Sequence, residues 1–302
     1  MGSEFVDEED GIRAVFLGTG VSTGLPGMHC IVRDREGVCK VCEEGLRDVY
    51  SPNRRGNVSL LLQYGSRNVL VDCGKTFRET ALRWFRKHEV NAIDAVILTH
   101  GHADAVGGID DLRDVQRPFS AATPIYLNSK TKLVCESAYP YLFPQRKASD
   151  VPRRIAHLDW RVISDNEVFQ VHGIPVKAFP VYHGGTYISL GFSFGKDKPL
   201  VYISDVSSFP EETLRTISSL SPISTLVIDA LNRGGHNAHL SLPEAIEFVK
   251  MIRPGKAYFV GMTCSLGLHQ DVNEELKSIS KESGIEMELA SDGLSVPIEM
   301  TG

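Results

Sequence analysis

The stretch Asp94-Ala95-Val96-Ile97-Leu98-Thr99-His100-Gly101-His102-Ala103-Asp104-Ala105 decides the fold. The apolar run at its start is typical of a buried strand, and two histidines and an aspartate follow at alternating positions. Because side chains alternate across a strand, His100 and His102 are expected on the same side of one sheet edge. Imidazole nitrogens beside the Asp104 carboxylate suit zinc, manganese or iron. The stretch therefore predicts a metal site at a strand end rather than a polar turn with incidental histidines.

The composition is ordinary for a soluble globular protein, with 42% hydrophobic and 23% charged residues among 302. The formal net charge of −6 argues against extended nucleic-acid binding, which requires a basic surface. A phosphate-bearing substrate is still compatible with this charge, because a bound divalent cation reverses the local sign. No stretch approaches the roughly 20 apolar residues of a membrane span, so no membrane partner is expected.

The chain is expected to form one domain, because no internal repeat or long linker interrupts it. Its beginning, Met1-Gly2-Ser3-Glu4-Phe5, looks like a cloning remnant, so residues 1–10 are expected to be cloning-derived or disordered and residues 11–302 to be the domain. Six cysteines are too few for a disulfide scaffold. Without a secretory signal, they favour the cytoplasm or another reducing intracellular compartment.

Short apolar runs recur along the chain and predict strands. They lie at Ala14–Leu17, Val58–Gln63, Asn68–Asp72, Ala95–Thr99, Ile125–Asn128, Val168–Val171, Val176–Pro180, Ser189–Phe194, Leu200–Ser204, Thr225–Asp229 and Ala257–Gly261. Helical spacing occurs at Phe77–His88, with Ala81, Leu82 and Phe85 on the apolar face. It also occurs at Ser241–Ile252, where Ser241 and Glu244 can form a capping box. Many strands with segregated helices indicate two packed sheets with helices outside.

Three of the six cysteines are clustered at Cys30, Cys39 and Cys42, in the pattern C-x8-C-x2-C. In a chain without a secretory signal, this spacing favours metal binding over disulfide formation.

Two further potential ligands, His183 and Asp205, directly follow later strand candidates. Each alone is typical of a turn residue or a loop cap, but their order after His100 and His102 favours ligands. The complete pattern resembles the metallo-β-lactamase superfamily, and within it the bacterial phosphonate-pathway cyclic phosphodiesterases and their relatives. The resemblance runs from about residue 13 to residue 293.

This resemblance implies an α+β fold of four αββα layers, in which two mixed β-sheets pack face to face with helices outside. It also implies a metal site formed by His100, His102 and His183, with Asp205 bridging towards a second metal and Asp104 beside it.

The chain departs from the family pattern at two positions of the second metal site. Ala105 and Gly261 stand where the resemblance leads one to expect histidines. Neither residue can bind a metal through its side chain. We therefore expect a weak or vacant second site and one tightly bound catalytic ion, with Asp104 and Asp205 available to position water.

The resemblance extends to a separate structural zinc held by the cysteine cluster in an insertion at about residues 28–52. There Cys264 falls on a position at which the relatives carry a histidine, giving the four-thiolate set Cys30, Cys39, Cys42 and Cys264. His29 and His269 are alternatives to Cys264. Cys73 and Cys135 have no partner at ligand spacing and are expected to be core thiols.

The resemblance also assigns supporting roles. Asp72 would hold the ligand histidines through hydrogen bonds. Asp104 is expected to accept the proton of the attacking water, and His239 to donate to the leaving oxygen or bind the substrate anion. His236 lies in the same segment and is expected to support the loop or contact substrate. Positive charge near the mouth of the active site is expected from Arg33, Arg54, Arg55, Lys75 and Arg78.

The function expected from these features is metal-dependent hydrolysis of small phosphodiesters, cyclic ones included, through a metal-activated water. The expected cofactors are one structural and one catalytic zinc, with manganese or nickel as alternatives at the catalytic site. A lactone or thioester hydrolase is an alternative enzyme, and a catalytically impaired zinc or metabolite-binding protein is an alternative of another class. The partner is expected to be a small-molecule phosphodiester, and a homodimer is compatible with the sequence.

Overall fold

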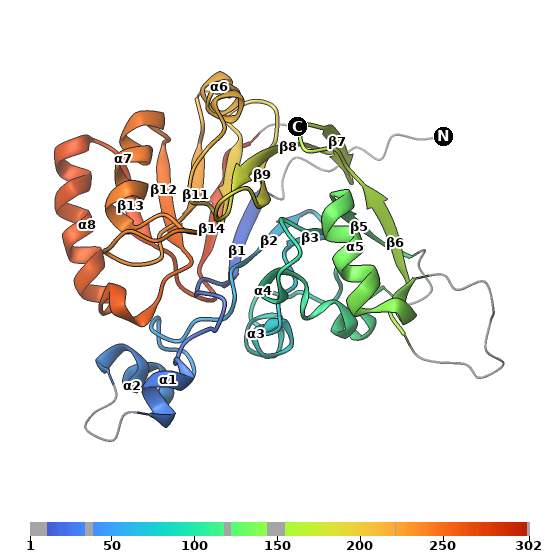
Figure 1. Ribbon diagram of the computed structural model, residues 1–302, viewed down its shortest axis with the longest axis horizontal. Coiled ribbons are helices and arrows are strands. Elements are labelled where there is room, and N and C mark those ends of the chain that lie inside the picture. Colours follow the sequence, from blue (N-terminus) through green and yellow to red (C-terminus); the bar gives the residue numbers. More distant parts are fainter. Residues whose placement is uncertain (1–10, 34–38, 118–121, 144–154, 221, 301–302) are drawn as a thin grey trace.

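Two seven-stranded sheets form the centre of the molecule (Figure 1). The structure is a computed structural model that describes residues 11–33, 39–117, 122–143, 155–220 and 222–300. The N-terminal segment expected at residues 1–10 lies outside these ranges. Among the described residues, no helix is both long and apolar enough to cross a membrane.

Both sheets are mixed, with antiparallel pairs towards one edge and parallel pairs towards the other. The first has the order β14 (Ser295–Ile298), β1 (Ile12–Gly18), β2 (Ser59–Tyr64), β3 (Arg67–Val71), β4 (Ala95–Ile97), β5 (Thr123–Leu127) and β6 (Leu158–Val162). The second has the order β13 (Glu286–Leu289), β12 (Lys256–Val260), β11 (Thr225–Asp229), β10 (Leu200–Ile203), β9 (Ile188–Phe194), β8 (Ile174–Tyr182) and β7 (Val168–Val171).

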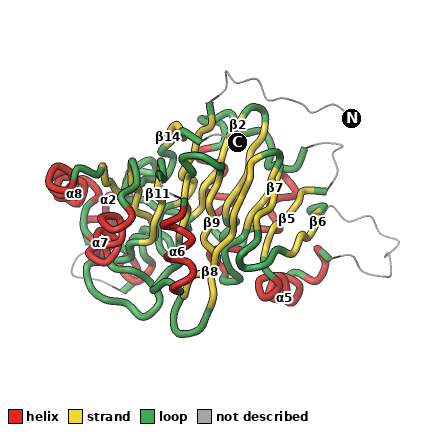
Figure 2. Tube along the Cα trace, turned by 90° about the horizontal axis from the view of Figure 1, so that it is seen from above, coloured by secondary structure: helices red, strands yellow, loops and turns green. Residues whose placement is uncertain are grey.

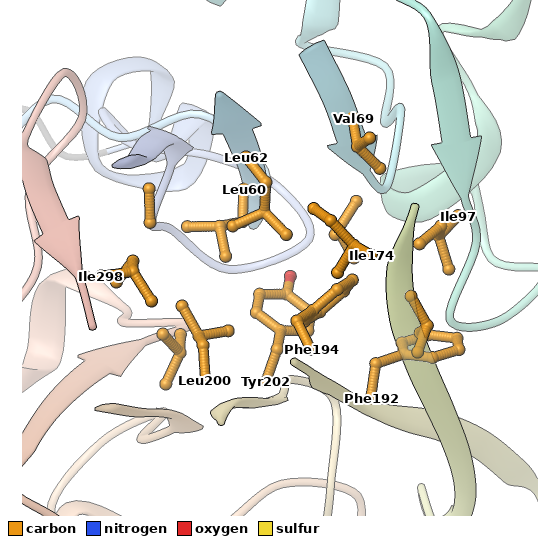
Figure 3. Packing of buried hydrophobic residues seen from close by; sticks show 14 of the residues in the cluster. Leu60, Leu62, Val69, Ile97, Ile174, Phe192, Phe194, Leu200, Tyr202 and Ile298 are labelled. Carbon is orange, nitrogen blue, oxygen red and sulfur yellow. The ribbon is translucent and has the colours of Figure 1, made fainter. Parts of the chain in front are cut away.

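The main core lies between the two sheets, where alternate side chains of each strand meet (Figure 3). In β2, Leu60 and Leu62 enter this core, whereas Leu61 points to the other face and joins the core beneath the helices. Phe192 and Tyr202 enter it from the opposite sheet. Strands buried on both faces read as continuous apolar runs, which is why these strands are recognisable in the sequence.

Helices cover the outer face of each sheet (Figures 1 and 2). On the first sheet lie α3 (Phe77–Trp84), α4 (Ala103–Val106), α5 (Ser129–Ala138) and the 3₁₀ turns η1 (Ile109–Asp114) and η2 (Pro140–Leu142). On the second lie α6 (Glu211–Ser219), α7 (Leu242–Ile252), α8 (His269–Ser283) and the 3₁₀ turn η3 (Cys264–Leu266). The predicted α+β architecture of four αββα layers is thus confirmed.

Of the two helices predicted from the sequence, α7 was predicted more accurately than α3. The capping box of α7 is present, with the Ser241 hydroxyl accepting from the Glu244 amide and the Glu244 carboxylate accepting from the Ser241 amide. In α3 the predicted apolar face is wrong at Leu82, which is 70% exposed. The helix ends at Trp84 rather than at His88 and buries Phe77, Thr80 and Trp84. Ala81 and Phe85, the other two residues of the predicted face, do pack on the core.

The cysteine-rich segment forms two short helices, α1 (Met28–Val32) and α2 (Lys40–Arg47), which lie below the sandwich in Figure 1. Helix α1 buries none of its five residues. A small cluster that includes Val41, Cys42 and Leu25 is the only apolar core found for this segment among the described residues. Packing alone therefore holds the segment weakly.

Candidate metal and catalytic site

The histidines of the opening stretch lie in the loop after β4, so strand alternation does not set their orientation as predicted. Strand β4 ends at Ile97, and the chain then turns into α4. His100 is buried and His102 is exposed, yet their ring centroids lie only 4.7 Å apart. The loop, rather than strand alternation, brings the two imidazoles together.

His183 joins these two rings from the end of β8. Its ring centroid lies 5.1 Å from that of His100 and 5.2 Å from that of His102. One ring nitrogen from each histidine lies within 4.8 Å of the others, which suits a shared metal ion. The Nδ1 atom of His183 lies 2.8 Å from the Ala238 carbonyl, so this ring donates through Nδ1 and leaves Nε2 facing the cluster.

A chain of hydrogen bonds fixes the orientation of His100. The Thr99 hydroxyl donates to the Asp72 carboxylate at 2.9 Å and lies 2.9 Å from His100 Nδ1, which must therefore donate to it. Burial lowers the pKa of His100 to about 4, so the ring is neutral near pH 7. Its Nε2 lone pair is then buried and, among the described residues, has no hydrogen-bond partner. A buried, unpartnered imidazole nitrogen is the arrangement that a metal ligand needs.

Two carboxylates lie beside the three histidines. Asp205 follows β10 in a left-handed conformation (φ 50°), and one of its oxygens is 4.0 Å from His183 Nε2. An Asp104 oxygen is 3.9 Å from His100 Nε2. Burial and the Asp205 charge raise the pKa of Asp104. Burial would also raise the pKa of Asp205, but the His100 and His183 rings outweigh it and lower this pKa.

The structure adds a residue that sequence reasoning did not assign to the site: Asp229, the last residue of β11. Its carboxylate lies 2.7 Å from Nδ1 of His239, whose ring centroid is 4.8 Å from that of His183. Although burial disfavours a charged His239, the hydrogen bond and charge of Asp229 raise the pKa of His239 to about 9. His236, which was predicted to support the loop or contact substrate, is exposed. Its ring centroid lies 5.4 Å from that of His239.

Asp229 also explains the glycine at position 261. A Cβ atom on Gly261 would lie 2.2 Å from Asp229 Oδ1, and the φ of Gly261 is +81°. A side chain here would collide with the carboxylate and strain the backbone. The narrow cavity beside it is lined by residues that include Asp72, Ala105, Asp104, Asp205, Asp229, His239 and Gly261. Carboxylates thus surround the place where the resemblance leads one to expect two more histidines.

The four predicted cysteines of the second cluster come together between the insertion and η3. Cys30 Sγ lies 3.6 Å from Cys39 Sγ and 3.7 Å from Cys264 Sγ, and all four sulfur atoms are within 4.8 Å of one another. A tetrahedral zinc with Zn–S bonds of about 2.3 Å places its sulfurs about 3.8 Å apart. Cys42 accepts a hydrogen bond from the Gly27 amide at 3.3 Å. The sulfur spacing therefore fits a four-thiolate zinc site.

The remaining cysteines and the alternative ligands also have clear locations. Cys73 and Cys135 are buried in the core beneath the helices of the first sheet, as predicted. His29 Nε2 is 3.9 Å from Cys264 Sγ, at the margin of the cluster. His269 lies apart from it, because its Nδ1 accepts from Arg55 at 3.0 Å.

Arg55 does not supply the positive charge that was predicted at the entrance of the active site. Its guanidinium is buried and donates to the Thr19 hydroxyl and the Ala290 carbonyl, so it supports the fold. Arg54 pairs with Glu79. Exposed positions remain for Arg33, Lys75 and Arg78.

The Arg55–His269 contact predicts a pH effect on stability. Burial and the Arg55 charge lower the pKa of His269 from 6.5 to about 4, so unfolding frees a ring that takes up a proton. The contribution of the neutral His269 ring to the free energy of unfolding is complete above pH 6.5 and is lost as the pH falls towards 4. Between these values, urea unfolding should show the wild type losing up to about 1.4 kcal/mol more per pH unit than His269→Asn. Parallel pH profiles for the two proteins would contradict this.

A sandwich of two mixed sheets with histidines and aspartates gathered at one edge defines the class of metallo-hydrolase folds. A model of the family described as the Beta-lactamase superfamily domain matches residues 67–262. The chain therefore belongs to the β-lactamase superfamily.

Solved structures agree with this assignment over nearly the whole chain. A crystal structure described as a new diphosphatase from the PhnP family is 28% identical, with a TM-score of 0.78 over 96% of this chain and 98% of that chain. Zn(2+)-bound PqqB from Methylobacterium extorquens is 17% identical (TM-score 0.69, 95% of this chain, 100% of that chain). The human short-form tRNase Z is 16% identical (TM-score 0.62, 95% and 100%). The last two share the fold alone.

A curated relative comes from Porphyromonas gingivalis and bears the name octanoyltransferase. It is 26% identical over 261 residues, which is 86% of this chain but only 48% of the relative. The chain thus spans about half the length of that protein.

Proposed function

We propose that this protein is a metal-dependent hydrolase of small phosphodiesters, cyclic ones included. The observation that carries the proposal is the convergence of His100, His102 and His183 on one point, with His239 and its Asp229 partner beside them. The similarity to a PhnP-family diphosphatase, at 28% identity, supports chemistry at phosphorus.

The proposed ligands of the catalytic ion are His100, His102, His183 and Asp205, with Asp104 beside them. A bound divalent ion would supply Lewis-acid activation and a water of lowered pKa. Asp104, whose carboxylate lies 3.9 Å from His100 Nε2, would take up the proton of the attacking water. His239, which holds a proton at neutral pH, would donate it to the leaving oxygen or bind the substrate anion.

We propose one zinc at this site and one at Cys30, Cys39, Cys42 and Cys264. Burial raises the pKa of Cys264 to about 12, so a cation is needed to ionise this thiol at neutral pH. The three nitrogen ligands also accept manganese or nickel. Because Ala105 and Gly261 provide no ligands, the second catalytic position should be weak or vacant. A thiolate zinc site of this kind would suit a reducing intracellular compartment, where thiols persist.

The test combines metal content with a substrate panel. About two zinc ions per chain are expected, and three would contradict the weak second site. Cyclic nucleotides, an aryl phosphodiester and an inorganic diphosphate should be assayed with zinc, manganese and nickel. Activity on none of these, nor on lactones or thioesters, would favour the catalytically impaired binding protein instead.

Lactone or thioester hydrolysis is the second candidate function. The name of the Porphyromonas gingivalis relative, octanoyltransferase, describes acyl transfer, which supports testing acyl compounds. An octanoyl thioester cleaved faster than every phosphodiester in the panel would favour this candidate.

Replacing Asp229 with asparagine tests the proposed proton donor. The amide keeps the shape but not the charge that holds a proton on His239, so kcat should fall about 10²-fold or more. The zinc content should stay unchanged, because Asp229 is not among the proposed ligands. Asp159→Asn, at a surface carboxylate paired with Arg161, is the matched control. Full activity of Asp229→Asn would exclude His239 as a charge-assisted donor.

A further inference from the structure

His102 differs from the other two histidines of the catalytic cluster in what holds its ring. His100 is fixed by Thr99, and His183 is fixed by the Ala238 carbonyl. No hydrogen bond reaches either ring nitrogen of His102 from any part of the chain that the structure describes. Its side chain is also exposed, so burial does not restrain it. Metal-binding histidines usually depend on a second hydrogen bond for their orientation.

Where the other two histidines have a hydrogen-bond partner, His102 has the aromatic ring of Tyr187 against it. Tyr187 lies in the turn between β8 and β9, and its ring stacks on His102 with centroids 4.7 Å apart and planes inclined by 16°. The same ring is edge-on to His100 at 6.3 Å and to His183 at 5.9 Å. One tyrosine therefore touches all three histidines of the cluster.

The rest of Tyr187 is tied to the same histidines through the backbone. Its phenolic oxygen accepts from the amide of Gly101, the residue between His100 and His102, at 3.3 Å. Its carbonyl accepts from the His183 amide at 2.8 Å, and its amide donates to the Gly184 carbonyl at 3.1 Å. These contacts join the loop after β4 to the loop after β8.

We propose that Tyr187 is a positioning residue of the catalytic metal site, which orients His102 by stacking and holds the two histidine-bearing loops together. The inference rests on the proposed function, because it takes the three histidines to be metal ligands. The stacked face restricts rotation of the imidazole, as a hydrogen bond does for the other two rings. The Gly101 contact fixes the backbone between the two ligands.

The experiment measures zinc affinity and the state of the His102 ring in the full chain. In a competition titration with a chromophoric chelator, Tyr187→Ala should weaken zinc binding at the histidine cluster about 10–100-fold, as loss of a supporting partner does elsewhere. The zinc at the cysteine cluster should be unaffected. Tyr187→Phe keeps the stacked ring and should recover most of the affinity. A merely structural role would not produce this rescue while thermal unfolding stays unchanged.

Tyr141→Ala is the matched control. Tyr141 is exposed to the same extent as Tyr187 (38%), but its ring packs against Tyr139. If Tyr187→Ala does not fold, Tyr187→Leu replaces it, because leucine keeps bulk without a stacking face.

A second readout separates this inference from the proposed function. In metal-free protein, the ¹H–¹⁵N signals of the His102 ring should broaden or shift in Tyr187→Ala and stay near their wild-type values in Tyr187→Phe. Unchanged His102 signals, or wild-type zinc affinity in a folded Tyr187→Ala, would overturn the inference. If the wild-type histidines bind no zinc while the His102 signals respond as expected, the proposed function fails and the positioning role stands.

Discussion

Replacing His183 with alanine is expected to lower kcat/KM by about 10³-fold or more and to remove the catalytic metal. His183 is one of the three histidines whose ring nitrogens lie within 4.8 Å of one another, and its Nε2 atom is 4.0 Å from an Asp205 oxygen. A metal contributes several kcal/mol to transition-state stabilisation, and each 1.36 kcal/mol is a tenfold change in rate.

The measurement pairs steady-state kinetics with metal analysis of the purified variant. His157→Ala is the control, because His157 is exposed and its ring makes no hydrogen bond to the described residues. The cysteine-bound zinc should remain in both variants, so metal content should fall from about two to about one only in His183→Ala. Wild-type turnover in His183→Ala would contradict the metal mechanism, and unchanged zinc content would contradict the ligand assignment.

The central strands could be predicted from sequence because both of their faces are buried. Leu60, Leu61 and Leu62 illustrate this, since neighbouring residues enter two different cores. The strands that sequence reasoning missed, β6, β13 and β14, are all edge strands. Charged residues such as Asp159 in β6 and Glu286 in β13 interrupt their apolar pattern, as is common at sheet edges.

Site residues could be predicted where their spacing in the sequence indicates metal binding. They could not be predicted where their role depends on contacts between distant segments. The order of His100, His102, His183 and Asp205 along the chain pointed to a ligand set. Asp229 read as an ordinary strand end, because its partner lies ten residues away and is brought back by a loop. Tyr187 offered no signal, since a stacked ring has no required spacing from the residue it covers.

Replacing Cys39 with serine is expected to release one zinc and to unfold the insertion while the sandwich persists. Helix α1 has no buried residue, and no side-chain cap holds either α1 or α2. A structural zinc contributes on the order of 10 kcal/mol in small domains. Loss of even a third of this corresponds to more than about 100-fold less amide protection in both helices, measurable by hydrogen exchange.

The same substitution should also affect the catalytic centre, because only a few contacts separate it from the cysteine cluster. Cys264 ties the insertion to the loop after β12, and Gly261 of that loop packs against Asp229. Release of Cys264 therefore frees the loop that supports the Asp229–His239 pair, and kcat should fall in Cys39→Ser although the histidine cluster keeps its metal. Cys135→Ala, at a buried thiol outside the cluster, should keep both zinc ions and normal protection of α1 and α2. Retention of two zinc ions by Cys39→Ser would show that sulfur spacing alone does not make this cluster a metal site.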